Sequence, residues 1–167
     1  MQHIQSFAPI ENAHATILIL GSMPGVASLR AGQYYAHPRN LFWRIMGELL
    51  KFDPASPYAL RVQALELAGI ALWDVLHSCR RNGSLDSDID DATLIPNNFA
   101  AFFLRHPHIA RVFFNGTKAE TCYRKQVLHT LGTDSIEYLR LPSTSPANAS
   151  VPYERKLEMW RVIAARD

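Results

Sequence analysis

The sequence is poor in cysteine and has no long apolar run. Only two cysteines occur, Cys79 and Cys122, without a Cys-x-x-Cys motif, which excludes a disulfide scaffold and an iron–sulfur cluster with four Cys ligands. No apolar stretch approaches about eighteen residues, so we expect neither a membrane span nor a membrane partner. Residues 1–11 lack the basic and apolar segments of a signal peptide. We therefore expect a protein with free thiols in a reducing cytoplasm.

The sequence also lacks the patterns of common metal sites. The seven histidines form no zinc spacing with the two cysteines. The acidic segment Asp86–Asp91 departs from a calcium loop, which needs Gly at its sixth place and Glu at its twelfth, because this chain has Asp91 and Asn97 there. We expect a solvated loop and a helix cap in this segment, and we expect neither a metal nor another cofactor.

Length and composition fit one ordinary globular domain. The chain has 167 residues, of which 48% are hydrophobic, enough for a sizeable core. We expect residues 1–167 to form a single domain without repeats or linkers. The net charge of +2 is compatible with a nucleic-acid partner but does not require one.

Short apolar runs alternate with helical patterns. Strands are predicted at Ala15–Leu20, Ile70–Leu76, Ala110–Phe114 and Ser135–Leu141, and helices at Leu41–Phe52, Pro57–Leu67, Ala92–Arg105, Thr117–Leu131 and Pro152–Ala165, with a long loop at His77–Asp91. This alternation predicts an α/β fold with three α/β/α layers around a central, mainly parallel four-stranded sheet. Ligands of such sheets bind outside the carboxyl ends of the strands, which here are residues 21–25, 73–74, 115–116 and 141–148.

The segment after the first predicted strand suits a nucleotide. Gly21–Gly25 is a turn rich in Gly and Pro, in which the backbone can approach a ligand closely. No acidic residue occurs between Glu11 and Glu48, and this gap holds Arg30, His37, Arg39, Arg44, Tyr34, Tyr35, Phe42 and Trp43. Bases stack on aromatic rings and phosphates pair with arginine, as a flipped nucleotide requires. The alternative is an ordinary loop with a core Phe-Trp pair, in which Asn40 caps the following helix.

Two motifs stand out in the sequence. The first comprises Gly21-Ser22-Met23-Pro24-Gly25, Tyr34-Tyr35-Ala36-His37-Pro38-Arg39-Asn40 and Phe42-Trp43, and the second is Leu141-Pro142-Ser143-Thr144-Ser145-Pro146-Ala147-Asn148. Both resemble motifs of the hypoxanthine-DNA glycosylase branch, family 6, of the uracil-DNA glycosylase superfamily. Motif spacing and strand order match over nearly the whole chain. The resemblance implies a monofunctional DNA glycosylase that flips hypoxanthine, a deaminated base, out of DNA and hydrolyses its N-glycosidic bond for base excision repair.

The resemblance also assigns residue roles. Catalysis falls to Asn40, whose carbonyl oxygen can orient a water while positioning and electrostatics assist. Other branches carry a catalytic Asp or Asn in the turn, where this chain has Ser22 and Met23. We expect base binding by Gly21, Ser22, Met23, Tyr35, Asp74 and Asn115, and DNA binding by Arg39, Ser143, Thr144, Ser145, Pro146 and Asn148.

Three positions bear on the choice of base. Asp74 replaces the base-reading Asn of the uracil-specific branch and can accept the N1–H of hypoxanthine, although it could instead cap a helix or pair with Arg80 or Arg81. Asn115 can read a base through its amide or form a positive-φ turn with Gly116. Leu141 stands where the uracil-specific branch has a His that polarises uracil, which argues against efficient uracil excision by that mechanism.

Other functions stay open at this point. They are a mismatch-specific uracil or thymine glycosylase, a non-catalytic DNA- or nucleotide-binding module, and a hydrolase of free nucleosides. We expect DNA containing deaminated bases as the partner and a monomeric protein. We expect no lyase step, because neither motif contains any of the lysines, Lys51, Lys118, Lys125 and Lys156.

Overall fold

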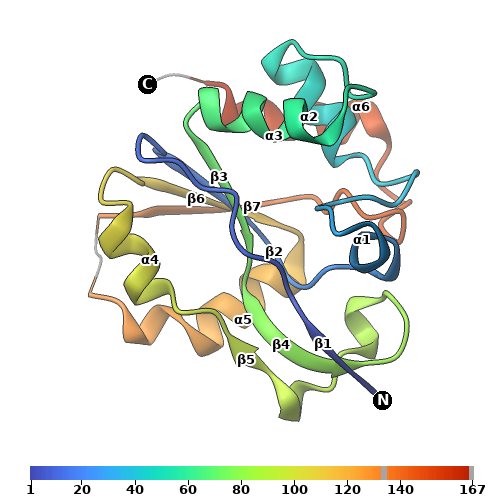
Figure 1. The fold of residues 1–167 in the computed structure, drawn as a ribbon, viewed down its shortest axis with the longest axis vertical. Coiled ribbons are helices and arrows are strands. Elements are labelled where there is room, and N and C mark those ends of the chain that lie inside the picture. Colours follow the sequence, from blue (N-terminus) through green and yellow to red (C-terminus); the bar gives the residue numbers. More distant parts are fainter. Residues whose placement is uncertain (133–134, 166–167) are drawn as a thin grey trace.

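A parallel sheet of four strands forms the centre of the computed structural model, which describes residues 1–132 and 135–165 (Figure 1). The strands are β2 (Ile17–Gly21), β3 (Ile70–Asp74), β6 (Arg111–Asn115) and β7 (Glu137–Leu141), in the order β3-β2-β6-β7. Every residue of β2 and β3 is buried, as expected for apolar runs in a sheet that is covered on both faces. The predicted parallel α/β sheet is confirmed.

Helices cover both faces of this sheet. On one face lie α2 (Phe42–Leu50), α3 (Tyr58–Leu67) and α6 (Tyr153–Trp160), and on the other lie α4 (Phe99–Arg105) and α5 (Thr117–Gln126) (Figure 1). Side chains of β2 alternate between the two cores, because successive residues of a strand point to opposite faces. Ile19 packs in the core that includes residues of α2 and α6, whereas Leu18 and Leu20 pack in the core of α4 and α5. The three predicted layers are therefore present.

A second, antiparallel sheet was not predicted. It consists of β1 (Gln2–Gln5), β4 (Leu76–Arg81) and β5 (Ile95–Pro96), in the order β1-β4-β5. The prediction of a loop over His77–Asp91 is therefore wrong for its first part. Because β4 buries the polar side chains of Ser78 and Arg81, its sequence does not resemble an apolar strand. The strand predicted at Ile70–Leu76 corresponds to β3, which ends at Asp74, and Leu76 instead begins β4.

Several other boundaries differ from the prediction. The predicted helix Ala92–Arg105 contains η2, a short 3-10 turn (Asp91–Thr93), then β5, and only then α4, whose cap Asn98 accepts a hydrogen bond from the Ala101 N–H at 3.1 Å. Both α5 and α6 end early, and each is followed by a 3-10 turn, η3 (Leu128–Thr130) and η4 (Arg161–Ile163). The short helix α1 (Val26–Ala31) was missed, and β7 begins at Glu137 rather than Ser135.

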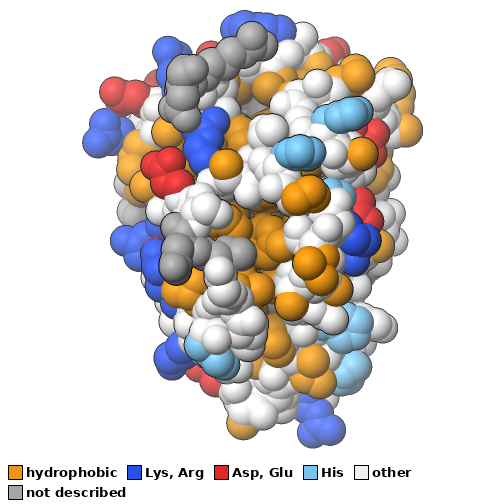
Figure 2. All heavy atoms as spheres, turned by 90° about the vertical axis from the view of Figure 1, so that its left-hand side faces the viewer, with side chains coloured by type: hydrophobic (Ala, Val, Ile, Leu, Met, Phe, Trp, Pro, Cys, Tyr) orange, Lys and Arg blue, Asp and Glu red, His pale blue; other side chains and the backbone are white. Residues whose placement is uncertain are grey.

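The two ends of the parallel strands make opposite sides of the molecule. The loops at the carboxyl ends lie on the right in Figure 1, together with α1. Figure 2 shows the other side, where hydrophobic side chains run along the middle and most Lys and Arg lie toward the edges. Within residues 1–132 and 135–165, no helix is both long enough and apolar enough to cross a membrane.

Candidate active site

A cleft of about 1090 Å³ opens at the carboxyl ends of the parallel strands. The turn at 21–25 follows β2, Asp74 ends β3, Asn115 ends β6, and residues 141–148 follow β7, so four chain segments meet there. The adjacent strands β2 and β6 are followed in the chain by β3 and β7, which lie on opposite sides of them in the sheet. The crevice between two such strands is the usual place for a ligand in these folds. All the residues predicted for catalysis, base binding and DNA binding line this one cleft.

Gly21 allows two buried polar groups to approach the floor of the cleft. A Cβ atom at this position would lie 2.5 Å from Asp74 Oδ1 and 2.8 Å from the Tyr35 hydroxyl oxygen. Both Asp74 Oδ2 and the Tyr35 hydroxyl are buried and have no hydrogen-bond partner of good geometry among the described residues, although the Asn115 amide lies close enough to Tyr35 to oppose the rise in its pKa. A buried polar group without a partner is costly, so these two atoms are candidates for hydrogen bonds to a ligand.

Asp74 is only 3% exposed, and this burial controls its ionisation. Burial, helped by the nearby Asp86 carboxylate and opposed by Arg81, raises the pKa of Asp74 to about 7. Near neutral pH the side chain is therefore present in both protonation states, as an acceptor alone or as a donor and acceptor. The alternative roles are not seen, because β4 rather than a helix follows Asp74, and the ion pairs of the described residues do not include it.

Tyr35 is held in place by its backbone and by packing. Its φ of 54° is uncommon for a residue with a side chain. Its ring stacks on the buried Phe42 ring, with 4.2 Å between centroids and 28° between planes. Burial raises the pKa of Tyr35, so the hydroxyl stays protonated and is able to donate a hydrogen bond. The sequence motif identified the residue but gave no sign of its unusual backbone.

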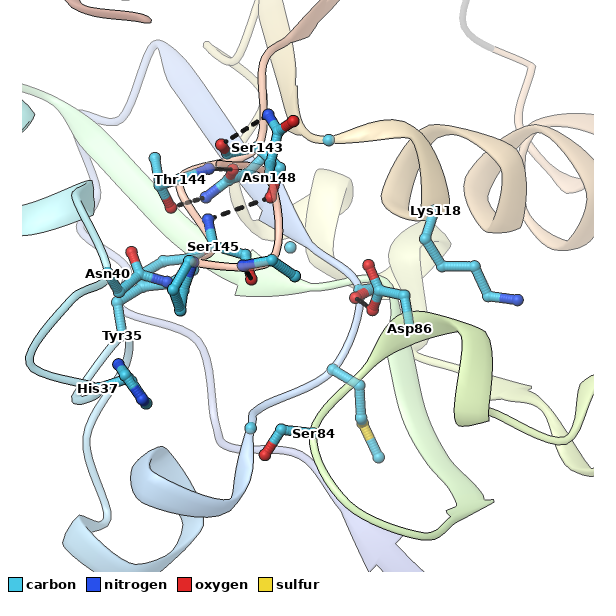
Figure 3. Close-up of a pocket in the computed structure, with 18 of the residues that line it drawn as sticks. Tyr35, His37, Asn40, Ser84, Asp86, Lys118, Ser143, Thr144, Ser145 and Asn148 are labelled. Carbon is cyan, nitrogen blue, oxygen red and sulfur yellow. Dashed lines mark hydrogen bonds between the residues drawn. The ribbon is translucent and has the colours of Figure 1, made fainter. Parts of the chain in front are cut away.

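Asn40 lines the cleft two residues before α2 begins. Its Oδ1 accepts a hydrogen bond from the Phe42 N–H at 3.0 Å, but Leu41 rather than Asn40 is the N-cap of α2, so the predicted capping alternative is seen only in this one bond. The same oxygen was predicted to hold the attacking water. An amide oxygen has two lone pairs, so the bond from the Phe42 N–H leaves one for a ligand. Figure 3 shows Asn40 beside Tyr35 on one wall of the cleft, with Asp86 on the opposite wall.

The second motif is attached to the end of β6 through Thr144, which is fully buried. Asn115 Nδ2 donates to Thr144 Oγ1, and the Thr144 N–H donates to Asn115 Oδ1, both at 2.9 Å. Gly116, with a φ of 95°, lets Ser143 approach, because a Cβ there would lie 2.9 Å from Ser143 Cβ. These contacts give the Asn115 amide a positioning role, and its contact with a base stays a prediction.

The remaining predicted DNA-binding residues shape the rim. Ser143 and Asn148 fold the second motif on itself, because Asn148 Nδ2 donates to the Ser143 carbonyl at 3.1 Å. The buried Lys156 of α6 stabilises this loop, because its Nζ donates a hydrogen bond to the Asn148 carbonyl at 2.8 Å. Arg39 is exposed at the edge of the cleft, where it can reach a phosphate.

One wall of the cleft is formed by a segment that was expected, from its acidic sequence, to be only a solvated loop with a helix cap. Asp86 begins η1 (Asp86–Asp88), and its Oδ1 accepts a hydrogen bond from Ser22 Oγ at 2.6 Å. The expected cap exists at Asp90, which accepts from the Ala92 N–H at 3.0 Å, but Asp86 faces the cleft. Its partner Ser22 is 64 residues away in the chain, so no local pattern reveals the pair. The described residues include no group of three potential metal ligands.

The fold and the cleft define an α/β protein with a binding site at the carboxyl edge of a parallel sheet. The sequence model of the Uracil DNA glycosylase superfamily matches residues 8–164. The chain belongs to this superfamily, as its two motifs predicted.

Proteins similar to this chain include two named hypoxanthine DNA glycosylases. The one from Methanosarcina barkeri (strain Fusaro) is 40% identical over 116 residues, which are 69% of this chain and 72% of the relative. The one from Methanosarcina acetivorans is 33% identical over 160 residues, 95% of this chain and 96% of the relative. The solution NMR structure of a candidate uracil DNA glycosylase from M. acetivorans superposes with a TM-score of 0.81 at 33% identity, covering 98% of this chain and 97% of that one.

Proposed function

We propose that this protein is a monofunctional DNA glycosylase that removes hypoxanthine from DNA and leaves an abasic site for base excision repair. The observation that carries the proposal is the pair of unpartnered polar atoms, Asp74 Oδ2 and the Tyr35 hydroxyl, on the floor of a cleft lined by both superfamily motifs. The likeness to hypoxanthine DNA glycosylases over most of the chain supports the same activity.

The two polar atoms suit one edge of hypoxanthine. This base carries a donor, N1–H, next to an acceptor, O6. The Asp74 carboxylate can accept from N1–H, and the protonated Tyr35 hydroxyl can donate to O6. Adenine presents an acceptor at N1, which an ionised Asp74 would repel. The ionised form of Asp74 therefore favours hypoxanthine over the undamaged base from which it arises.

The reaction breaks the bond between C1′ of the sugar and N9 of the purine. The electron pair of this bond leaves with the purine, and the sugar passes through an oxocarbenium-like state that water attacks. Hydrogen bonds to the departing base stabilise its negative charge. We propose that Asn40 helps to orient the water, and that the hydrogen bond from the Phe42 N–H keeps its side chain in one position.

The rim of the cleft would hold the DNA. Ser143, Ser145 and the backbone N–H groups of the second motif can contact phosphates without full charges, and Arg39 adds one positive charge. We propose that residues 1–167 form one glycosylase domain, which the family match over residues 8–164 supports, and that it acts as a monomer in the cytoplasm. Light scattering should give a mass near 18.8 kDa, and a dimer mass would contradict the monomer.

An excision assay tests the activity. The protein, in excess over duplex or single-stranded oligonucleotides with one deoxyinosine, should yield an abasic site that alkali converts to a strand break. Parallel substrates with uracil or thymine opposite guanine test the uracil and mismatch alternatives. No product from deoxyinosine at enzyme excess would overturn the proposal. Product from free inosine but not from DNA would instead indicate a nucleoside hydrolase.

A further inference from the structure

The first motif by itself provides no strong base for the attacking water. Its turn carries Ser22 and Met23, and the Asn40 carbonyl oxygen already accepts the Phe42 N–H. An amide oxygen can orient water but cannot hold its proton at neutral pH. The cleft therefore needs a proton acceptor from elsewhere in the chain.

The segment between β4 and β5 brings a carboxylate to this place. Asp86 Oδ1 accepts from Ser22 Oγ at 2.6 Å, directly beyond the end of β2. Among the residues that the structure describes, only Ser22 forms a hydrogen bond with the Asp86 carboxylate, which leaves Oδ2 free. The residue is exposed and lines the cleft, so this oxygen is open to water and substrate.

Further contacts fix this segment against the first motif. Ser84 Oγ accepts from the Val26 N–H at 2.9 Å. The buried side chain of Arg81, where β4 ends, donates through Nη2 to the Pro24 carbonyl. Arg81 also forms a β-bridge with the buried Ile89 beyond η1. The position of Asp86 therefore follows from contacts on both sides of it.

The Asp86 charge also acts at the floor of the cleft. It contributes to the raised pKa of both Asp74 and Tyr35, after the larger effect of burial. Because the charge of the Asp86 carboxylate affects the ionisation of these two residues, it would also attract a cationic sugar bound next to them. Asn40 lies across the cleft, so the two side chains flank the space where the nucleotide would enter (Figure 3).

We propose that Asp86 is a catalytic carboxylate of this enzyme, which accepts the proton of the attacking water and stabilises the cationic sugar. The inference rests on the proposed glycosylase function. The C1′–N9 bond breaks and its electrons go to the purine, while the water oxygen forms the new C1′–O bond. The water proton passes to Asp86 Oδ2 and then, through solvent, to the departing base.

Single-turnover excision from deoxyinosine DNA tests this role with three variants. Asp86→Asn keeps an oxygen for the Ser22 hydroxyl but removes the basic carboxylate, so the rate should fall by about 100-fold or more. The excision rate of Asp86→Ala should fall by at least as much. Asp88→Asn, in the same turn but outside the cleft lining, should stay within about twofold of the unchanged chain because it alters the charge without touching the site.

Two further measurements separate chemistry from folding and binding. The melting temperature of Asp86→Asn should match that of the unchanged chain, and its affinity for DNA should be equal or tighter because one negative charge is lost. An Asp86→Asn rate within twofold of the unchanged chain overturns the role of Asp86 and leaves the proposed function standing. An equal loss of rate in Asp88→Asn also overturns it. No product with the unchanged chain overturns both proposals.

Discussion

Asn115 and Thr144 form two hydrogen bonds with each other, both 2.9 Å long, through the Asn115 amide and the Thr144 hydroxyl and N–H. The Thr144 carbonyl in turn accepts from the Leu41 N–H at 3.0 Å. A single buried threonine thus connects β6, the second motif and the start of α2. The geometry of the DNA-facing loop depends on this residue.

Thr144→Val tests that connection. The variant keeps the shape of the side chain but removes the acceptor of Asn115 Nδ2, so the free energy of unfolding should fall by about 1–3 kcal/mol. Affinity for DNA should weaken because the second motif loosens. Urea unfolding and fluorescence anisotropy measure the two effects. Thr121→Val, exposed on α5, should change stability by less than about 0.5 kcal/mol. Equal stability of the two variants would contradict the role of Thr144.

Asn40 should show separable structural and catalytic effects. Asn40→Ala removes the acceptor for the Phe42 N–H, which should cost about 1 kcal/mol of stability, and should lower the excision rate by orders of magnitude. Asn40→Ser restores an oxygen that can accept from the Phe42 N–H without the amide, so its stability should recover while excision stays low. Recovery of excision in Asn40→Ser would mean that Asn40 acts only through its bond to the start of α2.

Asp74 should make stability depend on pH. Its pKa of about 7 in the folded protein exceeds the ordinary value of 3.8, so the folded state retains a proton that the unfolded chain releases. This contribution is complete below about pH 4 and is lost as the pH rises toward and through 7. Asp74→Asn should therefore match the unchanged chain at pH 4 and be more stable at pH 8, on the order of 2–4 kcal/mol. Unfolding curves at both values check this, and an Asp74→Asn variant that is no more stable than the unchanged chain at pH 8 would contradict the raised pKa of Asp74.

Gly116 should tolerate a side chain less well than Gly32. Both have positive φ, 95° and 63°, but a Cβ at Gly32 meets nothing within 4 Å, whereas one at Gly116 meets Ser143. Gly32→Ala should cost about 1–2 kcal/mol from backbone strain alone. Gly116→Ala should cost more and also weaken DNA binding, because Ser143 must move. Comparable losses of stability, with DNA binding intact in both variants, would show that the close approach at Ser143 is unimportant.

No covalent intermediate between the protein and DNA should form. Among the residues that the structure describes, Lys118 is the one lysine that lines the main cleft, and its Nζ lies 2.6 Å from Asp91 Oδ1. Burial alone would lower the pKa of Lys118, but the hydrogen bond to Asp91 and nearby negative groups raise it overall. A protonated amine is not a nucleophile. Borohydride should therefore trap no adduct with deoxyinosine DNA, and a trapped adduct would contradict the monofunctional assignment.

Strands β2 and β3 of the parallel core could be predicted because they are continuous apolar runs. β2 and β3 are buried throughout, and their sequences contain little else than apolar residues. The small sheet could not be predicted in this way. β4 buries Arg81 against the Pro24 carbonyl, and β5 has only two residues, so neither pattern stands out without its spatial partners.

The same limit applied to the site. Asn40, Asp74 and the second motif could be found because they lie in recognisable motifs or at the ends of apolar runs. Asp86 could not, because an acidic segment is usually solvated and its hydroxyl partner lies far away in the sequence. Asn115 was found because it lies at the end of a strand, but only the fold shows that its amide forms hydrogen bonds with Thr144.

The strand β1 offers a place outside the cleft for a probe that reports on the Asp86 segment. β1 pairs with β4 from Gln2 opposite Arg81 to Gln5 opposite Ser78, and β4 continues into that segment. Gln5 is exposed, whereas Cys79 and Cys122 are buried. A fluorophore attached through Gln5→Cys would therefore label one place and serve as a reporter. Its signal would follow movements of the small sheet as DNA enters, without any change to a residue that lines the cleft.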